Sequence, residues 1–465
     1  MRDLASFLTR SLHASTVAYI ALAPSRGSPT HSTPPTTMPV SDTWPDVDAF
    51  LDSLEPELAD RVTSMVAFLQ PRFNQIEAYA TSLHPLKLPC RIISERYTWG
   101  QSFTVFEIFF SNELSWIIRF GMRPMDAYFN TPAQLERKIL NEVAALRLVR
   151  ERTTIPVPHV IAYHPITSPN NPLGPDAPAF VLMTAMTGTT IGDYGISTSG
   201  GGDPLEGDES KRPILDQYLK DIADIHVQLS RITFDSIGSF VLQEDGCVTV
   251  GPGADYGLGP FSSATEYFNL QADAYERLAE AEPTSGDYTT LLKRQFVAML
   301  WRTAIMPLLD NRDDKGPFPM RHGDLHNDNI LVDNTGHIVG VLDWDCAGTV
   351  PWEAFAVPTF EVSGDFVDLG RGSRDERLAV HDAFNRALVE AQGPSTLASG
   401  RTLAELHNSN AGHVGAYLAY WMFSMACDYE QTGRALHDII GLPDDMDLAF
   451  QKFVRGKHLQ LSAHL

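Results

Sequence analysis

The chain has 465 residues, of which 43% are hydrophobic, and this is enough for a large core divided over two or three domains or lobes. Its formal net charge of -23 disfavours nucleic acid and anionic membranes as main partners, because an acidic surface repels both. The four cysteines lack the spacing of a disulfide framework, which favours an intracellular compartment, and no stretch approaches the roughly 18 apolar residues of a membrane-spanning helix.

Residues 1–45 have the composition of a segment that does not fold alone. They are rich in Ser, Thr and Pro, and they contain Arg2, Arg10 and Arg26 with two acidic residues. Leucines beside these arginines are compatible with the amphipathic helix of a mitochondrial presequence, so we expect either a disordered tail or a targeting segment. Translation from Met38 is a third alternative. The protein is accordingly expected in the cytoplasm or in mitochondria.

Residues 46–188 have the pattern of a β-rich first lobe that begins with a helix. Apolar residues at helical spacing predict an amphipathic helix over 46–69, interrupted at Pro56. Turn signals at Gly100 and at 111–112 separate three runs of β-branched and aromatic residues, 91–97, 98–110 and 114–120. Three consecutive strands with short connections predict an antiparallel sheet.

The remainder of this lobe is expected to alternate between helical and extended segments. Thr131 as N-cap and Pro132 at the first helical position predict a helix that ends near Arg150. The run I-P-V-P-H-V over 155–160 is extended, because proline disfavours helix for the residue before it. Residues 179–184, A-F-V-L-M-T, form a further strand.

Residues 189–465 are predicted to form a larger, mainly helical second lobe. Glycine, serine and acidic residues over 197–211 are typical of a flexible insertion. Helical spacing of apolar residues then predicts helices over 214–229, 264–281, 288–309, 374–391, 404–430 and 444–453. The fold class is therefore α+β, with a small antiparallel β-rich lobe followed by a helical lobe.

The stretch 321–345, R-H-G-D-L-H-N-D-N-I-L-V-D-N-T-G-H-I-V-G-V-L-D-W-D, carries most of the polar chemistry. Its apolar runs 330–332 and 338–342 predict two strands joined by a tight turn. Asn329 enters the first strand and Asp343 leaves the second, so antiparallel pairing brings the two side chains together. An amide oxygen and a carboxylate suit Mg²⁺. Asp324, one loop earlier, is near enough to share the site and accept a proton.

Two other interpretations of this stretch deserve comparison. His322 and His326 have the i, i+4 spacing of a zinc site on a helix, but Gly323 and the β-run that follows disfavour a helix. A solvated polar loop is the other alternative. It fits poorly, because the loop leads directly into an apolar hairpin with another carboxylate at its end. In the metal-site interpretation the two histidines hold the loop in shape.

The motif H-G-D-L-H-N-D-N-I-L-V, followed by V-L-D-W-D, resembles the catalytic and metal-binding loops of the aminoglycoside phosphotransferase and choline kinase-like family, which is related in fold to protein kinases. The spacing from Asp324 to Asn329 is that of kinase catalytic loops, and Asp343 occupies the position of the metal-binding aspartate. The resemblance implies a bilobal protein kinase-like fold, with Asp324 as catalytic base and Asn329 and Asp343 as Mg²⁺ ligands.

The resemblance also assigns roles in the first lobe. The turn Y-T-W-G-Q-S-F is similar to the phosphate-covering turn of the family, which implies phosphate contacts from Gly100 and Ser102. Arg119 stands where protein kinases have lysine. Similar fungal members of the family also have arginine there, and arginine contacts phosphate bidentately. Glu142 stands where the family places the glutamate that pairs with this cation, with Glu136 and Glu151 as competitors.

The segment M-T-A-M-T-G over 183–188 resembles the family's hinge between the lobes, which implies adenine contacts from Met183 and Ala185 through the backbone. The resemblance covers 91–345 with motifs and implies an ATP-dependent kinase for a hydroxyl of a small molecule, with GTP left open as the donor. It does not name the acceptor. The acidic residues that would suit a cationic acceptor, or are ordinary solvated acids, are Asp235, Asp255, Glu266, Asp345, Glu353, Asp428 and Glu430.

A catalytically silent, nucleotide-binding scaffold is the alternative from a different functional class. The presence of Asp324, Asn329 and Asp343 together argues against it, because loss of one such residue is the usual sign of a silent kinase-like protein. The arginine at 119 is the feature in its favour.

Overall fold

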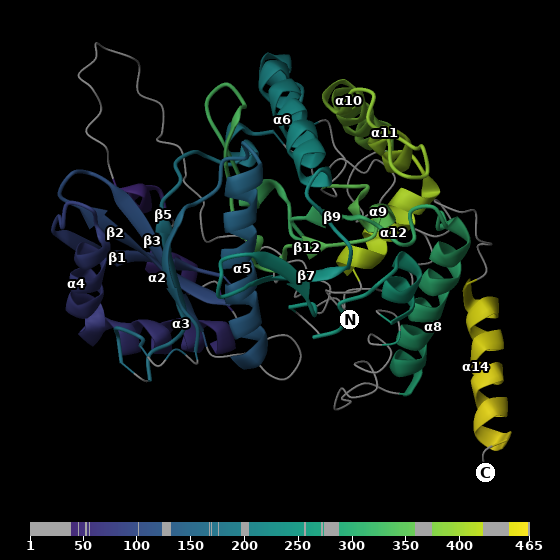
Figure 1. Ribbon diagram of the computed structural model, residues 1–465, viewed down its shortest axis with the longest axis horizontal. Coiled ribbons are helices and arrows are strands. Elements are labelled where there is room, and N and C mark those ends of the chain that lie inside the picture. The colour runs from purple at the N-terminus through teal and green to yellow at the C-terminus, as the bar shows by residue number, and fades with distance from the viewer. Residues whose placement is uncertain are drawn as a thin grey trace.

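In the computed structural model of the chain, the described residues are 39–44, 46–51, 54, 56–100, 102–122, 132–166, 168, 170–174, 176–196, 204–254, 257–270, 273, 288–358, 374–421 and 446–463. The N-terminal tail up to residue 38, the N-cap Thr131, and parts of the predicted insertion and of two predicted helices (197–203, 274–281 and 422–430) lie outside them. Figure 1 shows a sheet with flanking helices on one side of the molecule and most of the other helices on the opposite side, with α5 between them.

The first region contains a five-stranded antiparallel sheet in the order β1-β2-β3-β5-β4. Its strands are β1 (Cys90–Trp99), β2 (Phe103–Phe110), β3 (Ser115–Gly121), β4 (Val160–His164) and β5 (Phe180–Thr184). The three predicted antiparallel strands are confirmed, but β1 extends to Trp99, so that the first turn comprises residues 100–102. β4 was not predicted as a strand beyond its extended beginning, because prolines dominate the pattern before it.

Side chains of this sheet alternate between two cores, as the period of a strand requires. Phe106, Ile108 and Phe120 face a core that includes residues of α3 (Pro56–Leu69) and α4 (Phe73–Leu83). Val105 and Ile117 face the other core, which includes residues of α5 (Pro132–Arg152). The predicted helix over 46–69 is divided into α2 (Val47–Leu51) and α3, because Pro56 begins a new helix. Helix α4 was not predicted.

The folded part of the chain begins before residue 46, within the range expected for the tail. Residues Val40–Thr43 form a 3₁₀ helix, and Trp44, which follows it, is 5% exposed and belongs to the same core as α5. The carboxylate of Glu107 in β2 accepts hydrogen bonds from the backbone N–H groups of Val40 and Ser41 at 2.9 Å and 2.7 Å. This buried carboxylate anchors residues 39–44 on the first sheet.

The second region combines helices with a second sheet that was not predicted. The sheet has the order β6-β9-β12-β7-β8, and its strands are β6 (Thr233–Phe234), β7 (Gly238–Leu242), β8 (Val248–Gly251), β9 (Phe318–Arg321) and β12 (Gly348–Thr349). Strands of two to five residues are too short to show a period in the sequence. The α+β class is confirmed, and the described part of this region is mainly helical, as expected, with a five-stranded sheet in addition.

Helices of this second region match most of the predicted ranges. They are α6 (Arg212–Ser230), α8 (Tyr288–Ile305), α9 (Trp352–Phe355), α10 (Arg374–Gln392), α11 (Leu403–His407), α12 (Asn410–Trp421) and α14 (Met446–Ala463). Residues 264–270 are also helical. The helix predicted over 404–430 is interrupted at 408–409, where α11 ends and α12 begins. Within the predicted insertion, Leu205 is fully buried and Glu209–Lys211 form a 3₁₀ helix.

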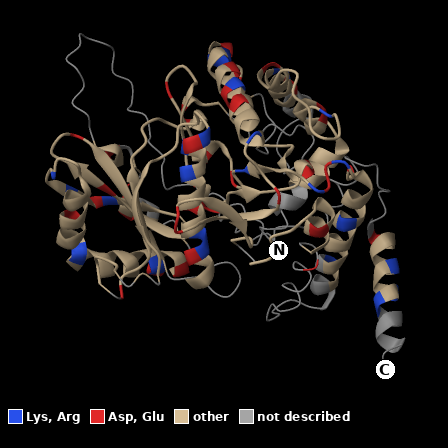
Figure 2. Cartoon of the chain, viewed as in Figure 1, with Lys and Arg blue, Asp and Glu red and all other residues tan. Residues whose placement is uncertain are grey.

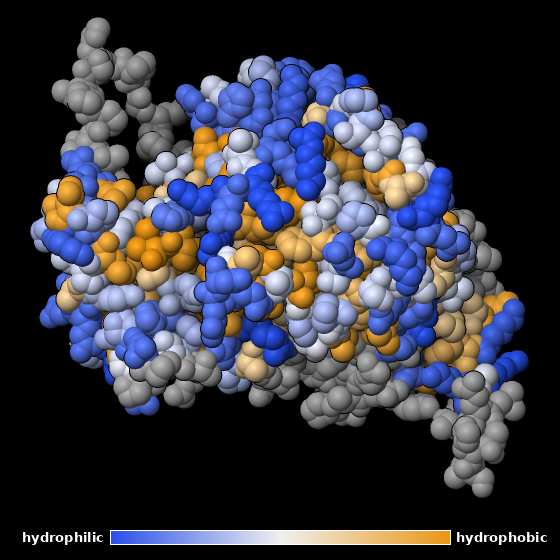
Figure 3. Space-filling model, viewed as in Figure 1, coloured by the Kyte–Doolittle hydropathy of each residue, from blue (hydrophilic) through white to orange (hydrophobic). Residues whose placement is uncertain are grey.

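Helix α6 shows how the predicted amphipathic pattern is used. Its buried residues include Leu215, Leu219 and Ile222. Figure 2 marks acidic and basic residues along the helix, and the surface at the top of Figure 3 is hydrophilic. The inner face packs against the hairpin of β10 (Ile330–Val332) and β11 (Ile338–Val341), so α6 supports the stretch that carries the polar chemistry. Among the described residues, no helix is long and apolar enough to span a membrane.

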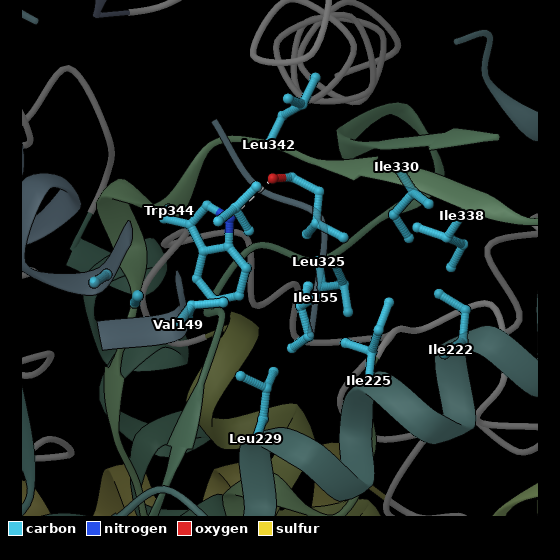
Figure 4. Close-up of a cluster of buried hydrophobic side chains, with 14 of the residues drawn as sticks. Val149, Ile155, Ile222, Ile225, Leu229, Leu325, Ile330, Ile338, Leu342 and Trp344 are labelled. Atoms are coloured by element: carbon cyan, nitrogen blue, oxygen red, sulfur yellow. Dashed lines mark hydrogen bonds between the residues drawn. The ribbon is translucent and has the colours of Figure 1, made fainter. Parts of the chain in front are cut away.

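Figure 4 shows the core below this hairpin, where side chains from four parts of the chain converge. The labelled residues come from the end of α5, the extended segment after it, α6 and the hairpin with its flanking loops: Val149, Ile155, Ile222, Ile225, Leu229, Leu325, Ile330, Ile338, Leu342 and Trp344. All ten are buried. Burial of this much apolar surface fixes the polar loops at both ends of the hairpin.

Candidate active site

The loop that follows β9 is held in shape by His322. This side chain is 2% exposed, its Nε2 donates to the carbonyl oxygen of Leu342 at 2.8 Å, and its ring lies 4.3 Å from that of Trp344. Burial lowers the pKa of His322 to about 4, so the imidazole is neutral near pH 7. Nδ1 then accepts the N–H of Asp324 at 3.3 Å. The expected structural role of His322 agrees with this geometry.

Gly323 is a site residue whose role the sequence did not reveal. Its φ is +92°, and a Cβ atom at this position would lie 2.1 Å from the carbonyl oxygen of Cys346. The loop before Asp324 and the loop after Asp343 therefore approach as closely as their backbones allow, which only glycine permits. In the sequence, Gly323 had served only as an argument against zinc.

Asn329 and Asp324 lie on the same loop and are connected directly. Asn329 is 2% exposed, and its Nδ2 donates to the carbonyl oxygen of Asp324 at 2.9 Å and lies 3.1 Å from Nε2 of His326. Because Nδ2 is oriented by these contacts, Oδ1 points to the opposite side of the amide. The side chain of Asp324 remains 27% exposed. A carboxylate that solvent reaches can also meet a substrate.

The hairpin brings Asp343 to the same end as Asn329, as predicted. β10 and β11 pair Ile330 with Val341, and the N–H of Leu342 donates to the carbonyl oxygen of Asn329 at 2.9 Å. Asp343 has a left-handed backbone conformation, with φ of 62°, which is uncommon for residues other than glycine. Conformations of this kind concentrate at functional sites.

Arg119 of β3 connects the first sheet with the hairpin. Its guanidinium is 3% exposed, contacts the carboxylate of Glu142 in α5 directly, and donates through NH2 to Oδ1 of Asp343 at 2.8 Å. The ring of Phe103 lies 4.2 Å from it. The structure thus joins Arg119 to Glu142 rather than to the competitors Glu136 and Glu151. Burial raises the pKa of Glu142, and the positive charge of Arg119 opposes this change.

Four residues predicted to contact a nucleotide lie in strands of the first sheet or directly beside them: Gly100, Ser102, Met183 and Ala185. The N–H of Gly100 donates to Phe103 O at 3.0 Å, and Ser102 O accepts from Met122 at 2.8 Å, so the turn 100–102 is tied to the end of β3. Met183 pairs with Ile117 of β3. The N–H of Ala185 donates to Ser115 O at 3.1 Å and is therefore engaged within the protein.

Two segments outside the motifs also position the hairpin. The N–H of Val341 donates to the carbonyl oxygen of Pro156 at 2.8 Å, so the extended I-P-V-P run lies beside β11. From α6, the hydroxyl of Tyr218 donates to Oδ1 of Asn327 at 2.7 Å, and Asp221 accepts the N–H of Ile338 at 2.8 Å. These α6 residues were missed, because a tyrosine and an aspartate on an amphipathic helix carry no local signal of such contacts.

Several of the acids proposed for an acceptor site are engaged elsewhere. Glu353 is 1% exposed and lies 3.3 Å from Arg401, and Asp345 lies 3.6 Å from Lys138. Glu266 accepts hydrogen bonds from Ser262 at 2.8 Å and 2.9 Å. Glu353 fits neither alternative given for these acids, an acceptor surface or a solvated acid, because it is buried in an ion pair. Asp255, Asp428 and Glu430 lie outside the described residues.

The donor set at the end of the hairpin fits Mg²⁺, although it is small. Oδ1 of Asn329 and the carboxylate of Asp343, which is 18% exposed, are hard oxygen ligands of the type this ion prefers. In the part of the chain that the structure describes, there is no group of three or more His, Cys, Asp and Glu side chains arranged for a metal ion. Mg²⁺ commonly uses one or two protein carboxylates and takes its other ligands from phosphates and water.

Comparisons with solved structures identify similar proteins at low sequence identity. A macrolide 2'-phosphotransferase type I has 15% identity and a TM-score of 0.40, with 80% of this chain and 97% of that chain covered. The macrolide 2'-phosphotransferase MphH of Brachybacterium faecium has 14% identity and a TM-score of 0.40, with coverages of 80% and 98%. The aminoglycoside phosphotransferase APH(4)-Ia has 14% identity and a TM-score of 0.42, with coverages of 80% and 99%.

None of the curated proteins compared with the chain matches it. The family model described as "Phosphotransferase enzyme family" (APH), in contrast, matches residues 95–353. The match begins in β1, ends in α9, and includes Arg119, Glu142 and the complete stretch 321–345. It covers more than half of the 465 residues. The chain therefore belongs to the APH phosphotransferase enzyme family.

Proposed function

We propose that this protein is an ATP-dependent phosphotransferase that moves the γ-phosphate to a hydroxyl group of a small molecule. The observation that carries the proposal is the buried contact of Arg119 with both Glu142 and Asp343, at the end of the hairpin that also holds Asn329. Phosphoryl transfer depends on positioning and charge stabilisation more than on covalent chemistry. A fixed cation, an exposed base and two oxygen ligands at one place supply both requirements.

In this proposal the described residues divide the work as follows. Arg119, steadied by Glu142, binds the α and β phosphates through its planar guanidinium. Gly100 and Ser102 cover the phosphates from the turn of the first sheet. Asp324 orients the acceptor hydroxyl and takes its proton, for which its partly exposed carboxylate is suited.

Asn329 and Asp343 would hold Mg²⁺ in the proposed enzyme. The bound ion supplies positive charge against the phosphate oxygens and lowers the cost of the charge that develops during transfer. The support for this assignment is the donor chemistry, together with the orientation of the Asn329 amide by its hydrogen bonds. Asp343 also contacts Arg119 at 2.8 Å, so in this proposal the cation and the metal ligand would act on the same phosphates.

The arrangement of the two sheets and the helices is interpreted here as a bilobal, protein kinase-like fold. The first sheet with α5 would form the nucleotide lobe, and the region from residue 189 onward the acceptor lobe. Met183 and Ala185 border the adenine in this interpretation, and GTP is a second donor to be tested. The acceptor is a hydroxylated small molecule, with a cationic compound as one class to be tested.

The Asp324→Asn variant tests the central assignment. Because the carboxamide cannot accept the proton, transfer should fall by at least about 10²-fold, while Mg²⁺-dependent nucleotide binding stays close to that of the wild type. The matched variant Asp343→Asn removes a charge at the metal site and should weaken nucleotide binding itself. Binding is measured by titration of a fluorescent nucleotide, and transfer with radiolabelled ATP. Wild-type turnover in Asp324→Asn would refute the assignment of the base.

The same assay separates the enzyme from the silent scaffold. The wild-type protein is incubated with ATP or GTP, Mg²⁺ and a panel of hydroxylated amines, sugars and acids. Transfer of label to any acceptor, or slow hydrolysis of the nucleotide, supports the enzyme. Nucleotide binding that is tight but accompanied by neither would establish the scaffold instead.

A further inference from the structure

Asn141 of α5 makes a three-way contact at the centre of the molecule. Its side chain is 1% exposed, and its Nδ2 donates to the carbonyl oxygens of Asp345 and Ala347 at 2.9 Å and 2.7 Å. Its Oδ1 accepts the backbone N–H of Phe240, in β7, at 2.7 Å. One buried amide therefore joins α5, the loop after Asp343 and the second sheet, and both of its polar atoms are used.

The neighbours of Asn141 on the helix contact the same region. Glu142, the next residue, contacts Arg119, which in turn contacts Asp343. Lys138, one turn earlier, lies 3.6 Å from the carboxylate of Asp345. Thus α5 contacts Arg119 of β3 through Glu142, and it contacts the loop that follows Asp343 through Lys138 and Asn141. The distance between the Arg119–Glu142 pair and that loop is set by this helix.

We propose that Asn141 is a positioning residue, which fixes the Arg119–Glu142 ion pair relative to Asp343 through its hydrogen bonds to the loop 345–347 and to β7. The inference deepens the proposed phosphotransferase function and rests on it. Asn141 itself contacts none of the groups assigned to the reaction, so it acts through α5 and through the backbone next to Asp343.

The chemistry of the site explains why an amide is required. Two carbonyl oxygens need donors and one N–H needs an acceptor, and asparagine offers this combination in a short side chain. Movement of α5 away from the loop would leave these buried groups without partners, which is unfavourable. Ion pairs alone tolerate variation in distance and angle better than three directed hydrogen bonds. Asn141 therefore supplies the geometric precision that Lys138 does not.

The test compares Asn141→Ala with Thr349→Val. Thr349 of β12 is a suitable control, because its hydroxyl is also buried and also joins backbone groups outside α5, donating to Ser236 O at 2.8 Å and accepting from Gly238 N at 3.0 Å. Asn141→Ala should lower kcat/KM for the nucleotide by about 10–10²-fold, the effect of a displacement near 1 Å. Thr349→Val should stay within about threefold of the wild type, even if its Tm falls equally.

A double-mutant cycle distinguishes positioning from a general loss of stability. If Asn141 acts through the Arg119–Glu142 pair, Asn141→Ala should lower activity by less than about twofold in a Glu142→Gln background, because the pair is already disrupted. Multiplicative effects of the two substitutions would overturn the proposal. So would an Asn141→Ala variant with wild-type kcat/KM.

Hydrogen exchange without nucleotide tests the connection independently of activity. In Asn141→Ala, amides of α5 and of 344–347 should exchange faster together, whereas Thr349→Val should affect β7 and β12 but leave α5 unchanged. Unchanged exchange in α5 would refute the positioning role. If the wild-type protein binds neither ATP nor GTP, the proposed function fails, and exchange still decides whether Asn141 holds α5 to the loop.

Discussion

Two arginines of this protein each contact two carboxylates, in regions with different tasks: Arg119 with Glu142 and Asp343, and Arg401 with Asp313 and Glu353. In the first group Arg119 and Glu142 are closed off from solvent, at 3% and 1% exposure, while Asp343 is 18% exposed. In the second group both carboxylates are closed off, at 1% and 2%, and the arginine is 23% exposed. The first group thus exposes a carboxylate to solvent, and the second exposes its guanidinium.

The difference indicates what each group can bind. The open member of the first group is a carboxylate in a left-handed conformation, and it can take a cation such as Mg²⁺ in addition to Arg119. In the second group the Asp313 carboxylate also accepts the N–H of Ser399 at 2.9 Å, so its oxygens are satisfied within the protein. The two groups therefore differ in which charge reaches solvent: a carboxylate, Asp343, in the first and a guanidinium, Arg401, in the second.

Replacement of each arginine by methionine should have different effects: loss of activity in the first group and loss of stability in the second. Arg119→Met removes the cation proposed to bind phosphate and should lower transfer by about 10²–10³-fold. The loss of stability is limited, because burial already raises the pKa of Glu142 and the residue can take up a proton. Arg401→Met leaves Asp313 and Glu353 buried without their cation and should lower the free energy of unfolding by about 3–5 kcal/mol.

Steady-state transfer kinetics and urea denaturation of the same preparations distinguish the two. Transfer per folded molecule should be unchanged in Arg401→Met. If Arg401→Met were instead as stable as the wild type and poorly active, the Arg401 group would belong to the active site rather than to the structural core.

His226 contrasts with these ion clusters, because it is a titratable side chain that is buried in its neutral form. His226 of α6 is 2% exposed and stacks on Phe355 at 4.1 Å, and burial lowers its pKa to about 3. Below the unfolded pKa of about 6.5, the unfolded chain binds a proton that the folded protein does not. Stability is therefore complete above pH 6.5 and falls as the pH decreases, by about 2 kcal/mol at pH 5.

His226→Phe keeps the stacked ring and removes the proton. Its free energy of unfolding should decrease between pH 7 and pH 5 by about 2 kcal/mol less than that of the wild type. His337→Gln is the control, because the His337 side chain is 56% exposed. An identical pH dependence of the wild type and His226→Phe would show that His226 is protonated in the folded state.

The residues of the first ion cluster could be predicted from the sequence, and those of the second could not. Asp343 and Asn329 flank two short apolar runs with a turn between them, so their convergence follows from strand pairing alone. Glu142 and Arg119 are 23 residues apart, and their pairing was expected from the resemblance. Asp313, Glu353 and Arg401 occupy a loop, a short helix and another loop, and no local period connects them.

Contacts made through the backbone were equally hidden. Gly323 is required because the carbonyl group of Cys346 approaches it, and this approach depends on the packing of two loops. Asn141 appears in the sequence as one polar residue on a long helix, and nothing local distinguishes it from the exposed polar residues of the same helix. The second sheet was missed for a related reason: each strand is too short to show alternation, and apart from the local pair β7–β8 its strands pair with neighbours far along the chain.

A fourth buried carboxylate, Glu107, extends the comparison, because it accepts hydrogen bonds from backbone N–H groups. The Val40→Pro variant removes one of these donors, the N–H that lies 2.9 Å from Oε1. The preceding residue, Pro39, has ψ of 139°, a conformation that a following proline accepts. The lost bond to a charged group costs about 1.5–3 kcal/mol, and the stiffer unfolded chain offsets about 0.4–1 kcal/mol.

Val40→Pro should therefore lower the free energy of unfolding by about 1 kcal/mol, whereas Val40→Ala, which keeps the N–H, should remain within about 0.5 kcal/mol of the wild type. Urea denaturation measures both, and limited proteolysis reports whether residues 39–44 separate from the first sheet in Val40→Pro. Equal stability of the two variants would mean that burial of Trp44, rather than the Glu107 carboxylate, holds this segment in place. Glu107 and Asp313 both accept hydrogen bonds from backbone N–H groups, but in that case only Asp313 would contribute to stability through them.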